Sequence, residues 1–452
     1  MEFWADLLSN KETGLEGYCD NIESQNIEID ENTRMVLDAL EKNKYVFLTG
    51  AAGTGKSYTT RKVIQVYGKE NVAVTASTGA AAIVVGGDTI HKIFKLGINN
   101  DIQSMLAFDN KMIEQIMNNR GVDEDDARRI YFYKTKNVLE AAKLLIIDEI
   151  SMLSAKHIEM IFYRIKQFNL EKLQILAVGD FLQLPPVTKS NEKKEYAFEH
   201  PLWEQNFKTV ELTEVKRTSD EEFIYVLRQI RKGKYTRRVD EFIKQHTVDK
   251  LPKECNQLFS LRRKVEIINE KMLNEIEATP YKFKGHFLVS ANKNEEKKYL
   301  KEIPTPLELT LKVGCRVMFT ANVNGLYVNG EMGTVTELSE DNIKVMKDNG
   351  NVVKVELFSF KRYKTTERNG KIVMEEDIAF VQYPLTIGYA STIHKSQGAS
   401  IDKVGIDCKG IFEDSQFYVA MSRAKDPNNL YIKNFERYHI QVDDKVLEFY
   451  GM

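Results

Sequence analysis

The sequence predicts an α/β protein: parallel β-sheets covered by helices, with a phosphate-binding loop after the first strand and a small antiparallel β module inserted late in the chain. Three observations predict this class. Short apolar segments alternate with helical stretches from residue 45 to residue 212. A glycine-rich octapeptide follows the first of these segments. All four Asn-Gly dipeptides of the chain fall between residues 324 and 370.

The apolar segments are expected to form the strands of a first parallel sheet. Each is short and is followed by a helical pattern, as in repeated β-α units. The predicted strands are Tyr45–Thr49, Val72–Ala76, Leu144–Ile147, Ile175–Val178 and Thr209–Leu212. We therefore expect a first α/β domain at residues 31–215, interrupted by a polar insertion at about 92–139.

The octapeptide GAAGTGKS lies between a buried strand and a helix that Gly68 ends. A phosphate-binding loop requires this order, because glycines turn backbone N–H groups toward a polyphosphate and the helix N-terminus adds positive charge. Lys56 would reach the β- and γ-phosphates, and the Ser57 hydroxyl would hold Mg²⁺. Nucleotide contacts are expected from Gly50, Gly53, Thr54, Gly55, Lys56 and Ser57. The alternative is a tight glycine turn without a ligand.

Polar residues also follow the later strands of this sheet. Asp148 and Glu149 end the apolar segment at 144–147, where phosphate-loop enzymes place a Mg²⁺ ligand and the group that orients or deprotonates the attacking water. Gln183 lies just past the strand that ends at Val178, where an amide could contact the γ-phosphate. A loop braced only by its prolines is the alternative for this last segment.

Two arginines from elsewhere in the chain complete the predicted site. Arg217 follows the last strand of the first domain, and Arg423 lies near the C-terminus in the string FYVAMSRAK. An arginine from a second domain that points at the γ-phosphate stabilises transition-state charge and couples hydrolysis to closure. Taken alone, each arginine is more typical of a surface position or an ion pair.

The polar insertion ends in a run of basic and aromatic residues, RRIYFYK, from Arg128 to Lys134. This interleaving suits stacking on single-stranded bases. An amphipathic helix that buries the rings would contain the same residues. The sequence does not choose between these two interpretations.

The Asn-Gly dipeptides predict the β module, because both residues accept positive φ and Asn-Gly is the strongest short hairpin signal. Short β-prone segments flank them at Leu309–Leu311, Arg316–Phe319, Gly333–Glu337, Ile343–Met346 and Val352–Glu356. We expect a small barrel at about 290–375. The α/β pattern returns with strands at Ile387–Tyr389 and Val404–Ile406. The barrel therefore interrupts a second α/β domain at residues 216–452.

Composition excludes several classes of protein. The 452-residue chain is 42% hydrophobic and 29% charged, which is typical of a globular protein. No apolar run reaches the roughly 20 residues of a membrane span, and the acidic start argues against a secretory signal, so a cytoplasmic location is expected. The four cysteines stand apart, which argues against a zinc cluster or disulfide framework. The net charge of −2 does not decide whether nucleic acid binds in a narrow basic groove.

Residues 1–30 form an acidic N-terminal segment that begins with an apolar cluster. The cluster consists of Phe3, Trp4, Leu7 and Leu8. We expect it to pack on the protein's own core, and docking to a partner protein is the alternative.

Together these motifs resemble those of the PIF-type superfamily-one DNA helicases, with RecD-like and phage Dda helicases as further relatives. Additional strings carry the resemblance: VTASTGAAA and GGDTIH between Val74 and His91, and YASTIHKSQG from Tyr389 to Gly398. The resemblance covers about residues 29–432. It implies two RecA-like domains with ATP between them, a wedge insertion in the first and an SH3-like barrel inserted in the second.

Carried over position by position, the resemblance implies an ATPase site made of Lys56, Ser57, Asp148, Glu149, Gln183, Arg217 and Arg423. It implies that a single DNA strand runs along Thr78, Gly79, Thr89, His91, Thr392, His394 and Lys395, and it places Gly398 beside the nucleotide. Hydroxyls, imidazoles and an ammonium suit phosphate contacts and offer little means of reading bases. The strand-separating wedge is expected at Phe108, Tyr131, Phe132 or Tyr133.

One position departs from the family pattern. The family usually carries a glutamine that recognises adenine upstream of the phosphate loop, and this chain has Thr33 there, while Gln25 lies too far upstream. Asn32 could make a similar contact with a shorter reach. We therefore expect Asn32 to contact the base.

The resemblance implies an ATP-dependent DNA helicase that uses Mg²⁺, moves 5′ to 3′ on single-stranded DNA as a monomer, and unwinds forked or tailed duplexes in replication, repair or recombination. G-quadruplex DNA is a further candidate substrate. One alternative is a DNA-stimulated translocase that displaces proteins or remodels DNA without processive unwinding. Another is a nucleotide-gated binding module without hydrolysis, against which Asp148, Glu149 and Gln183 argue.

Overall fold

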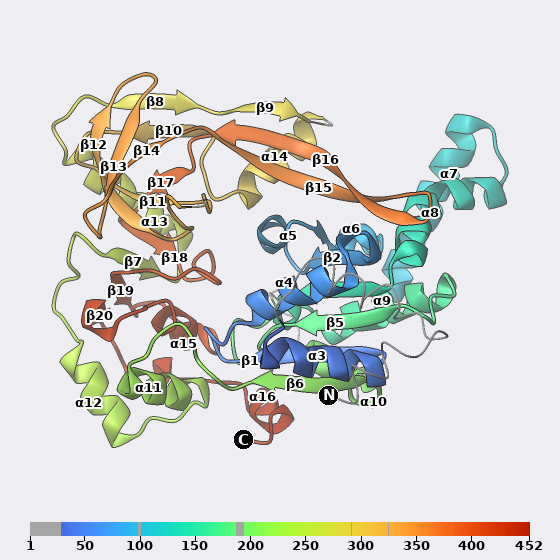
Figure 1. Cartoon of the computed structure of the whole chain (residues 1–452), viewed down its shortest axis with the longest axis horizontal. Helices are drawn as coiled ribbons and strands as arrows, with labels where there is room; N and C mark the ends of the chain where they lie inside the picture. Colours follow the sequence, from blue (N-terminus) through green and yellow to red (C-terminus); the bar gives the residue numbers. More distant parts are fainter. Residues whose placement is uncertain (1–28, 98–100, 187–193, 291, 324) are drawn as a thin grey trace.

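A computed structural model describes residues 29–97, 101–186, 194–290, 292–323 and 325–452 of the chain. The N-terminal apolar cluster at residues 3–8, Gln25 and Asn324 lie outside the described residues. Two parallel sheets, a barrel-like antiparallel module and a pair of projecting helices make up the molecule (Figure 1).

The first sheet has the strand order β3-β2-β4-β5-β1-β6, and all of its pairs are parallel. The strands are β1 (Tyr45–Gly50), β2 (Val72–Ala76), β3 (Asp88–Thr89), β4 (Leu144–Asp148), β5 (Gln174–Val178) and β6 (Phe207–Leu212). Alternate residues of β1, β2, β4 and β5 enter two separate apolar cores, so Phe47 lies in one and Val46 in the other. Both faces of these four central strands are covered, and for this reason they are largely apolar, whereas the edge strands β3 and β6 are not.

Helices cover this sheet and extend beyond it. They are α3 (Glu31–Lys42), α4 (Lys56–Tyr67), α5 (Gly79–Val85), α6 (Ile90–Ile93), α9 (Ala155–Gln167) and α10 (Pro201–Asn206). The polar insertion forms two further helices, α7 (Ile102–Arg120) and α8 (Glu124–Ala141), which project at the right of Figure 1. The structure therefore makes the insertion helical along most of its length.

The second parallel sheet has the order β18-β7-β19-β20. Its strands are β7 (Asn256–Phe259), β18 (Ala390–Thr392), β19 (Val404–Asp407) and β20 (Leu430–Lys433), and its helices include α11 (Glu221–Arg231), α12 (Arg237–Gln245), α13 (Arg262–Asn274) and α15 (Gln416–Met421). The predicted strand at 387–389 is wrong. Ile387 ends a strand of the antiparallel module, and the parallel strand begins at Ala390, because one apolar run crosses the boundary between the two units.

The antiparallel module has a sheet of order β14-β13-β12-β11-β17 and a two-stranded pair, β10 with β8. The strands are β8 (Tyr281–Lys284), β10 (Glu308–Leu311), β11 (Arg316–Phe319), β12 (Met332–Leu338), β13 (Ile343–Lys347), β14 (Val352–Val355) and β17 (Leu385–Ile387). They extend beyond the predicted limits of 290–375 at both ends. Two of the Asn-Gly dipeptides connect paired strands, Asn349-Gly350 between β13 and β14 and Asn369-Gly370 in the hairpin that follows.

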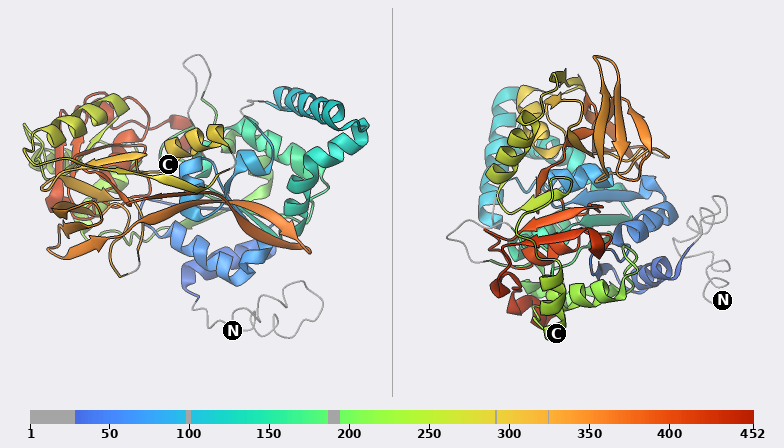
Figure 2. Two further views of the ribbon diagram at one scale, coloured as in Figure 1. Left: turned by 90° about the horizontal axis from the view of Figure 1, so that it is seen from above. Right: turned by 90° about the vertical axis from the view of Figure 1, so that its left-hand side faces the viewer.

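A long hairpin leaves this module and reaches the first domain (Figure 2). It consists of β15 (Phe358–Arg368) and β16 (Lys371–Gln382), with β9 (His286–Val289) alongside β16, and α14 (Lys293–Glu302) packs beneath it. The backbone N–H of Thr365 donates to buried Asp88 at 2.8 Å, and Lys92 pairs with Asp377 at 3.1 Å. The hairpin thereby joins the module to α6 and to the edge of the first sheet.

The C-terminal helix α16 (Asp444–Phe449) returns to the first domain. Val446 lies in the first domain's core, and Phe449 packs against Phe47, Phe181 and Phe198. The chain therefore crosses between the two α/β domains a second time. Among the described residues, no helix combines the length and the apolar character needed to cross a membrane.

Candidate functional site

The phosphate loop has the backbone geometry that its glycines predict. Gly53 and Gly55 have φ of 83° and 95°, values that side chains other than glycine rarely adopt. The ammonium of Lys56 donates to the carbonyls of Gly50 at 2.7 Å and Ala51 at 3.2 Å. Burial lowers the pKa of Lys56, while Asp180 and Glu149 oppose that shift. The lysine thus lies folded over the loop, within reach of the carboxylates around it.

The two predicted carboxylates lie at the end of β4, beside the phosphate loop. Glu149 has a left-handed backbone, with φ of 51°, and its N–H donates to the Asp148 carboxylate at 2.9 Å. Burial raises the pKa of both groups, and for Glu149, where Asp148 adds to the effect, to about 7. Gln397, from the second domain, donates to Glu149 at 3.1 Å. A residue of the second domain therefore contacts the expected catalytic base directly.

The residues predicted to hold Mg²⁺ fit that role chemically. Ser57 is the second residue of α4 and is exposed, and Asp148 is half-buried at the end of β4. A hydroxyl and a carboxylate are the hard oxygen ligands that Mg²⁺ takes beside a substrate phosphate. Burial raises the pKa of both carboxylates, and a divalent cation beside them would favour their charged forms.

The two predicted arginines lie together at the domain interface. Arg217 donates to the carbonyl of Ser422, the residue before Arg423. Burial lowers the pKa of Arg423 to about 9, and the neighbouring charge of Arg217 adds to that shift. Each of the three side-chain nitrogens of Arg423 donates to an oxygen of its own domain, including Val419 at 2.9 Å. In this conformation Arg423 is therefore held within the second domain.

Gln183 is buried and belongs to a turn organised by Asp180. Its backbone N–H donates to the Asp180 carbonyl at 2.9 Å, and its side-chain amide lies 3.4 Å from the Asp180 carboxylate. This turn follows β5, which pairs with β1, the strand that leads into the phosphate loop. The amide thus lies on the same edge of the sheet as the predicted phosphate site.

Sequence reasoning missed four residues that join the domains at this site. The hydroxyl of Tyr418 accepts from the backbone N–H of Ala52, in the phosphate loop, at 2.9 Å. The others are Asp180, Arg231 and Tyr450. Tyr418 belongs to the string FYVAMSRAK that contains Arg423, and Asp180 lies between Val178 and Gln183, but no spacing in the sequence links either residue to its partner. Arg231 and Tyr450 belong to no motif, and the sequence carries no signal for them.

For Asn32 and Gly398, the two further residues expected to contact the nucleotide, the structure gives a position but, within the described part of the chain, no hydrogen bond with the phosphate loop. Asn32 lies in the first turn of α3 and is half-buried, whereas Thr33 beside it is fully buried. Gly398 has a left-handed backbone, with φ of 77°, and follows Gln397. Contacts of Asn32 and Gly398 with a nucleotide remain predictions.

The three threonines of the predicted DNA path share one local role. Thr78 lies just after β2, and its hydroxyl accepts a backbone N–H at the start of α5 at 3.2 Å. Thr89 is the last residue of β3, and its hydroxyl accepts a backbone N–H at the start of α6 at 3.3 Å. Thr392, at the end of β18, accepts the N–H of Lys395 at 3.1 Å. All three lie at carboxyl ends of parallel strands, where ligands of such sheets bind.

The remaining residues of this path have more varied surroundings. His91 packs edge-on against His157 at 5.0 Å, and burial lowers its pKa, which keeps the imidazole neutral. His394 lies 3.2 Å from Glu413. Much of the Lys395 side chain is exposed, but partial loss of water around its ammonium, and then the nearby charge of Arg262, lower its pKa. The carboxylate of Glu302, from α14, packs so closely on Gly79 that a Cβ there would lie 2.3 Å from it. In this conformation α14 covers the Gly79 end of the path.

The structure contradicts two of the four wedge candidates. Tyr131 and Phe132 point into the first domain: the Tyr131 hydroxyl donates to buried Asp109 at 3.1 Å, and Phe132 packs on Phe168. Both rings are less than 10% exposed, so they cannot meet DNA in this conformation. Because α8 is amphipathic, the ring next in sequence, Tyr133, faces outward and is 67% exposed. Phe108, on α7, is 41% exposed.

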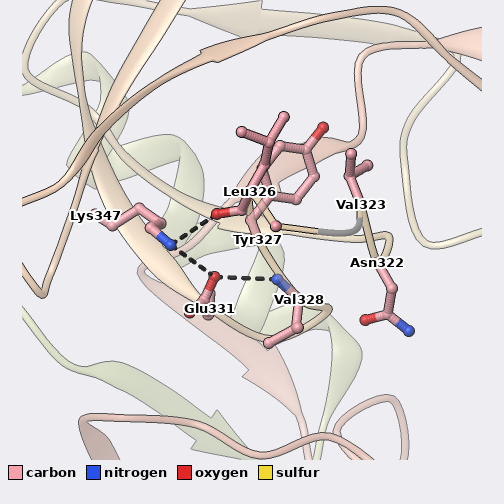
Figure 3. Close-up of a pocket in the computed structure, with 8 residues that line it drawn as sticks. Asn322, Val323, Leu326, Tyr327, Val328, Glu331 and Lys347 are labelled. Carbon is pink, nitrogen blue, oxygen red and sulfur yellow. Dashed lines mark hydrogen bonds and ion pairs between the residues drawn. The ribbon is translucent and has the colours of Figure 1, made fainter.

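A separate hollow lies in the antiparallel module and does not adjoin the phosphate loop. Figure 3 shows Lys347 donating to the Leu326 carbonyl, at 2.7 Å, and pairing with Glu331 at 3.5 Å. Glu331 also accepts the N–H of Val328 at 3.0 Å. Its charged side chains thus already have partners, and the predicted chemistry does not involve this hollow.

Known proteins resemble the chain along nearly its whole length. A family model described as PIF1-like helicase matches residues 27–241, and one described as Helicase matches residues 345–444. The chain is 35% identical over 432 residues to the ATP-dependent DNA helicase Pif1 of Bdellovibrio bacteriovorus, covering 94% of this chain and 92% of that protein.

Solved structures give the same result. The crystal structure of Bacteroides sp Pif1 in complex with ADP-AlF4 matches with a TM-score of 0.79 at 28% identity, covering 94% of this chain and 97% of that one. Bacteroides Pif1 bound to ssDNA matches with a TM-score of 0.60 at 28% identity, covering 94% and 96%. The overall arrangement of this chain is therefore nearer to the first of these two structures.

The fold and the site together show a phosphate-loop protein with two RecA-like parallel-sheet domains that meet at the loop. The identity and coverage of the Bdellovibrio relative then show the family. The chain belongs to the PIF1-like helicases.

The position of Glu149 yields a first test. Glu149→Gln keeps the shape of the side chain but removes the proton acceptor, so we expect ATP turnover to fall by about 10²-fold or more while nucleotide binding is retained. Phosphate release and binding of a fluorescent ATP analogue measure the two effects. The exposed residue Glu204 supplies the control, Glu204→Gln, which should turn over normally. Unchanged turnover in Glu149→Gln would refute the assignment of the base.

Proposed function

We propose that the protein is an ATP-dependent DNA helicase that moves 5′ to 3′ along single-stranded DNA and separates duplex strands ahead of it. One observation carries the proposal. The segment from Thr392 to Gln397 contains three predicted DNA contacts and also the amide that bonds Glu149 at 3.1 Å. DNA that displaces this segment would therefore act directly on the catalytic base.

The proposed hydrolytic step follows from the geometry of the interface. Lys56 exchanges its bonds with the loop carbonyls for the β- and γ-phosphates, and the loop N–H groups and the start of α4 stabilise the same charge. Glu149 accepts the proton of the attacking water. Mg²⁺, held by Ser57 and Asp148, would neutralise phosphate charge when bound.

The second domain supplies the remaining groups in this proposal. Arg217 already lies against the loop, because its Cβ is 2.6 Å from where a Cβ on Gly53 would be. Arg423 is held beside it and would act on the γ-phosphate after a change in its own bonding. Closure of the two domains therefore assembles the site, and release of phosphate weakens it.

The proposed DNA path runs along both domains, with Thr78, Thr89 and His91 on the first and Thr392, His394 and Lys395 on the second. A strand gripped by both domains is pulled when their separation changes. The lower TM-score of the relative bound to ssDNA supports a rearrangement of the parts when DNA binds. Here α14 covers Gly79, so DNA has to move it.

The proposed partners are single-stranded DNA and forked or tailed duplexes, bound by a monomer, with G-quadruplex DNA as a further substrate. The proposed location is the cytoplasm, where a cell without a nucleus keeps its DNA. For the N-terminal segment at residues 1–30, contact with a protein partner is the alternative to packing on the protein's own core.

Dependence on DNA and direction of movement test the proposal together. We expect ATP turnover to rise at least about tenfold, a barrier change of about 1.4 kcal/mol, when single-stranded DNA is added. Duplexes with a 5′ tail should be unwound and those with a 3′ tail should not, with ATP omitted as the control. Equal turnover with and without DNA would contradict a motor, and stimulated turnover without unwinding would favour the translocase alternative.

The exposed aromatic residues of the insertion test strand separation. Tyr133→Ala and Phe108→Ala should lower unwinding of a forked duplex severalfold, because an inserted ring contributes about 1–3 kcal/mol of stacking per base, while ATP turnover with single-stranded DNA is retained. Tyr438→Ala, at an equally exposed ring near the C-terminus, is the matched control. Normal unwinding by both insertion variants would exclude these rings as the wedge.

A further inference from the structure

A turn after β5 carries Gln183 and is built around one carboxylate. Asp180 accepts the backbone N–H of Leu182 at 3.1 Å through its side chain, and its own carbonyl accepts the N–H of Gln183. The amide of Gln183 lies 3.4 Å from the same carboxylate. The position of Asp180 therefore determines where the predicted γ-phosphate contact points.

The second domain holds this carboxylate through an arginine. Arg231, the last residue of α11, donates from Nε and Nη2 to the two oxygens of Asp180, at 3.2 and 2.9 Å. Both side chains are buried, with 5% and 1% of their surface exposed. Although burial alone would raise the pKa of Asp180, the charges of Arg231 and Lys56 hold it below its usual range. Two parallel hydrogen bonds fix direction as well as distance.

The C-terminus adds a third contact to the same turn. The hydroxyl of Tyr450 shares a hydrogen bond with Thr49 at 2.8 Å, accepts the N–H of Phe181 at 3.3 Å, and lies 3.5 Å from Asp180. The guanidinium of Arg231 lies over the Tyr450 ring at 5.5 Å. Thr49 immediately precedes the phosphate loop, so this tyrosine joins the turn after β5 to the strand that begins the loop.

We propose that Arg231 is a positioning residue for ATP hydrolysis. Through Asp180 it ties the turn that bears Gln183 to the second domain, so that the γ-phosphate contact moves with that domain, and Tyr450 keeps the turn in register with β1. The inference rests on the proposed function. A merely structural ion pair would stabilise the interface without affecting the chemical step.

The experiment compares Arg231→Gln, Arg231→Lys, Asp180→Asn and Tyr450→Phe with the wild-type chain. Arg238→Gln is the matched control, because Arg238 pairs with Glu222 on the exposed side of the same domain. We expect Arg231→Gln to lower DNA-stimulated kcat at least about tenfold, while the KM for ATP and the Kd for single-stranded DNA stay within about twofold. Asp180→Asn should have the same effect, and the double variant should be no slower than either single variant, because both act through one contact.

Arg231→Lys separates positioning from stability. Lysine keeps the charge but lacks the planar fork, so the melting temperature should remain near wild type while kcat stays low. Tyr450→Phe removes only the hydroxyl and should give a smaller loss of kcat. A melting temperature and kcat that fall in parallel in every variant would overturn the proposal, as would a rise in KM with unchanged kcat.

Hydrogen exchange provides a readout that does not need turnover. Peptides that cover residues 178–186 should exchange faster in Arg231→Gln than in wild type, and Arg238→Gln should leave them unchanged. Unaltered exchange in this segment would overturn the positioning role even if kcat fell. A wild-type chain without DNA-stimulated turnover would instead contradict the proposed function, and the exchange of this segment would still decide whether Arg231 holds the turn.

Discussion

The approach of the second domain to the phosphate loop is the contact on which the rest of the site depends. Gly53 leaves room for the side chain of Arg217, because a methyl group on Gly53 would lie 2.6 Å from the arginine's Cβ. The Ala52 N–H donates to Tyr418, from the other domain, at 2.9 Å. Gly53 is therefore required for two reasons: its backbone has a positive φ, and the neighbouring domain leaves no space for a side chain. A change in the conformation of the loop would therefore alter its contacts with Tyr418 and Arg217 in the second domain.

The charged groups at this interface explain why a triphosphate suits it. Burial disfavours the charged form of each group, so it raises the pKa of Asp148 and Glu149 and lowers that of Lys56 and Arg423. A polyphosphate brings negative charge to the cations, and its metal ion brings positive charge to the carboxylates. A metal–polyphosphate ligand would thus give both sets of groups an opposite charge in their buried surroundings, which supports the predicted nucleotide site.

Local sequence predicted the parts of the site whose geometry depends on neighbouring residues. The phosphate loop and the two carboxylates after β4 occur at strand ends, and strand ends are visible as apolar runs that stop. The pairs Asp180–Arg231 and Thr49–Tyr450 are separated by 51 and 401 residues, and no period or spacing relates them. Such contacts arise only when the second domain and the C-terminus pack on the first, so a single sequence without alignment contains no trace of them.

The fold, like the site, was predictable where neighbouring residues determine the structure. The main strands of the first sheet were found because both of their faces are buried, whereas two-residue β3 has too little apolar length to stand out. The aromatic run at 131–133 shows the limit of composition. Stacking on bases and burial in an amphipathic helix both require these aromatic residues, so composition does not distinguish the two interpretations. In the structure the helical period turns Tyr131 and Phe132 inward and leaves Tyr133 exposed.

The two long-range connections to the first domain differ in their physical character. At the nucleotide end, Val446, Phe449 and Tyr450 pack on the apolar core, and such burial is not weakened by salt. At the end where the DNA path is predicted, the hairpin β15–β16 contributes Ile372 to that core, and Ile83 packs against the hairpin's own apolar cluster. Polar contacts add to these, among them the buried bond of Thr365 with Asp88 and the partly exposed pair of Lys92 with Asp377. Exposed ion pairs contribute little each and are screened by salt. The connection beside the predicted DNA path therefore depends partly on ion pairs that salt weakens, whereas the connection beside the phosphate loop depends mainly on apolar burial.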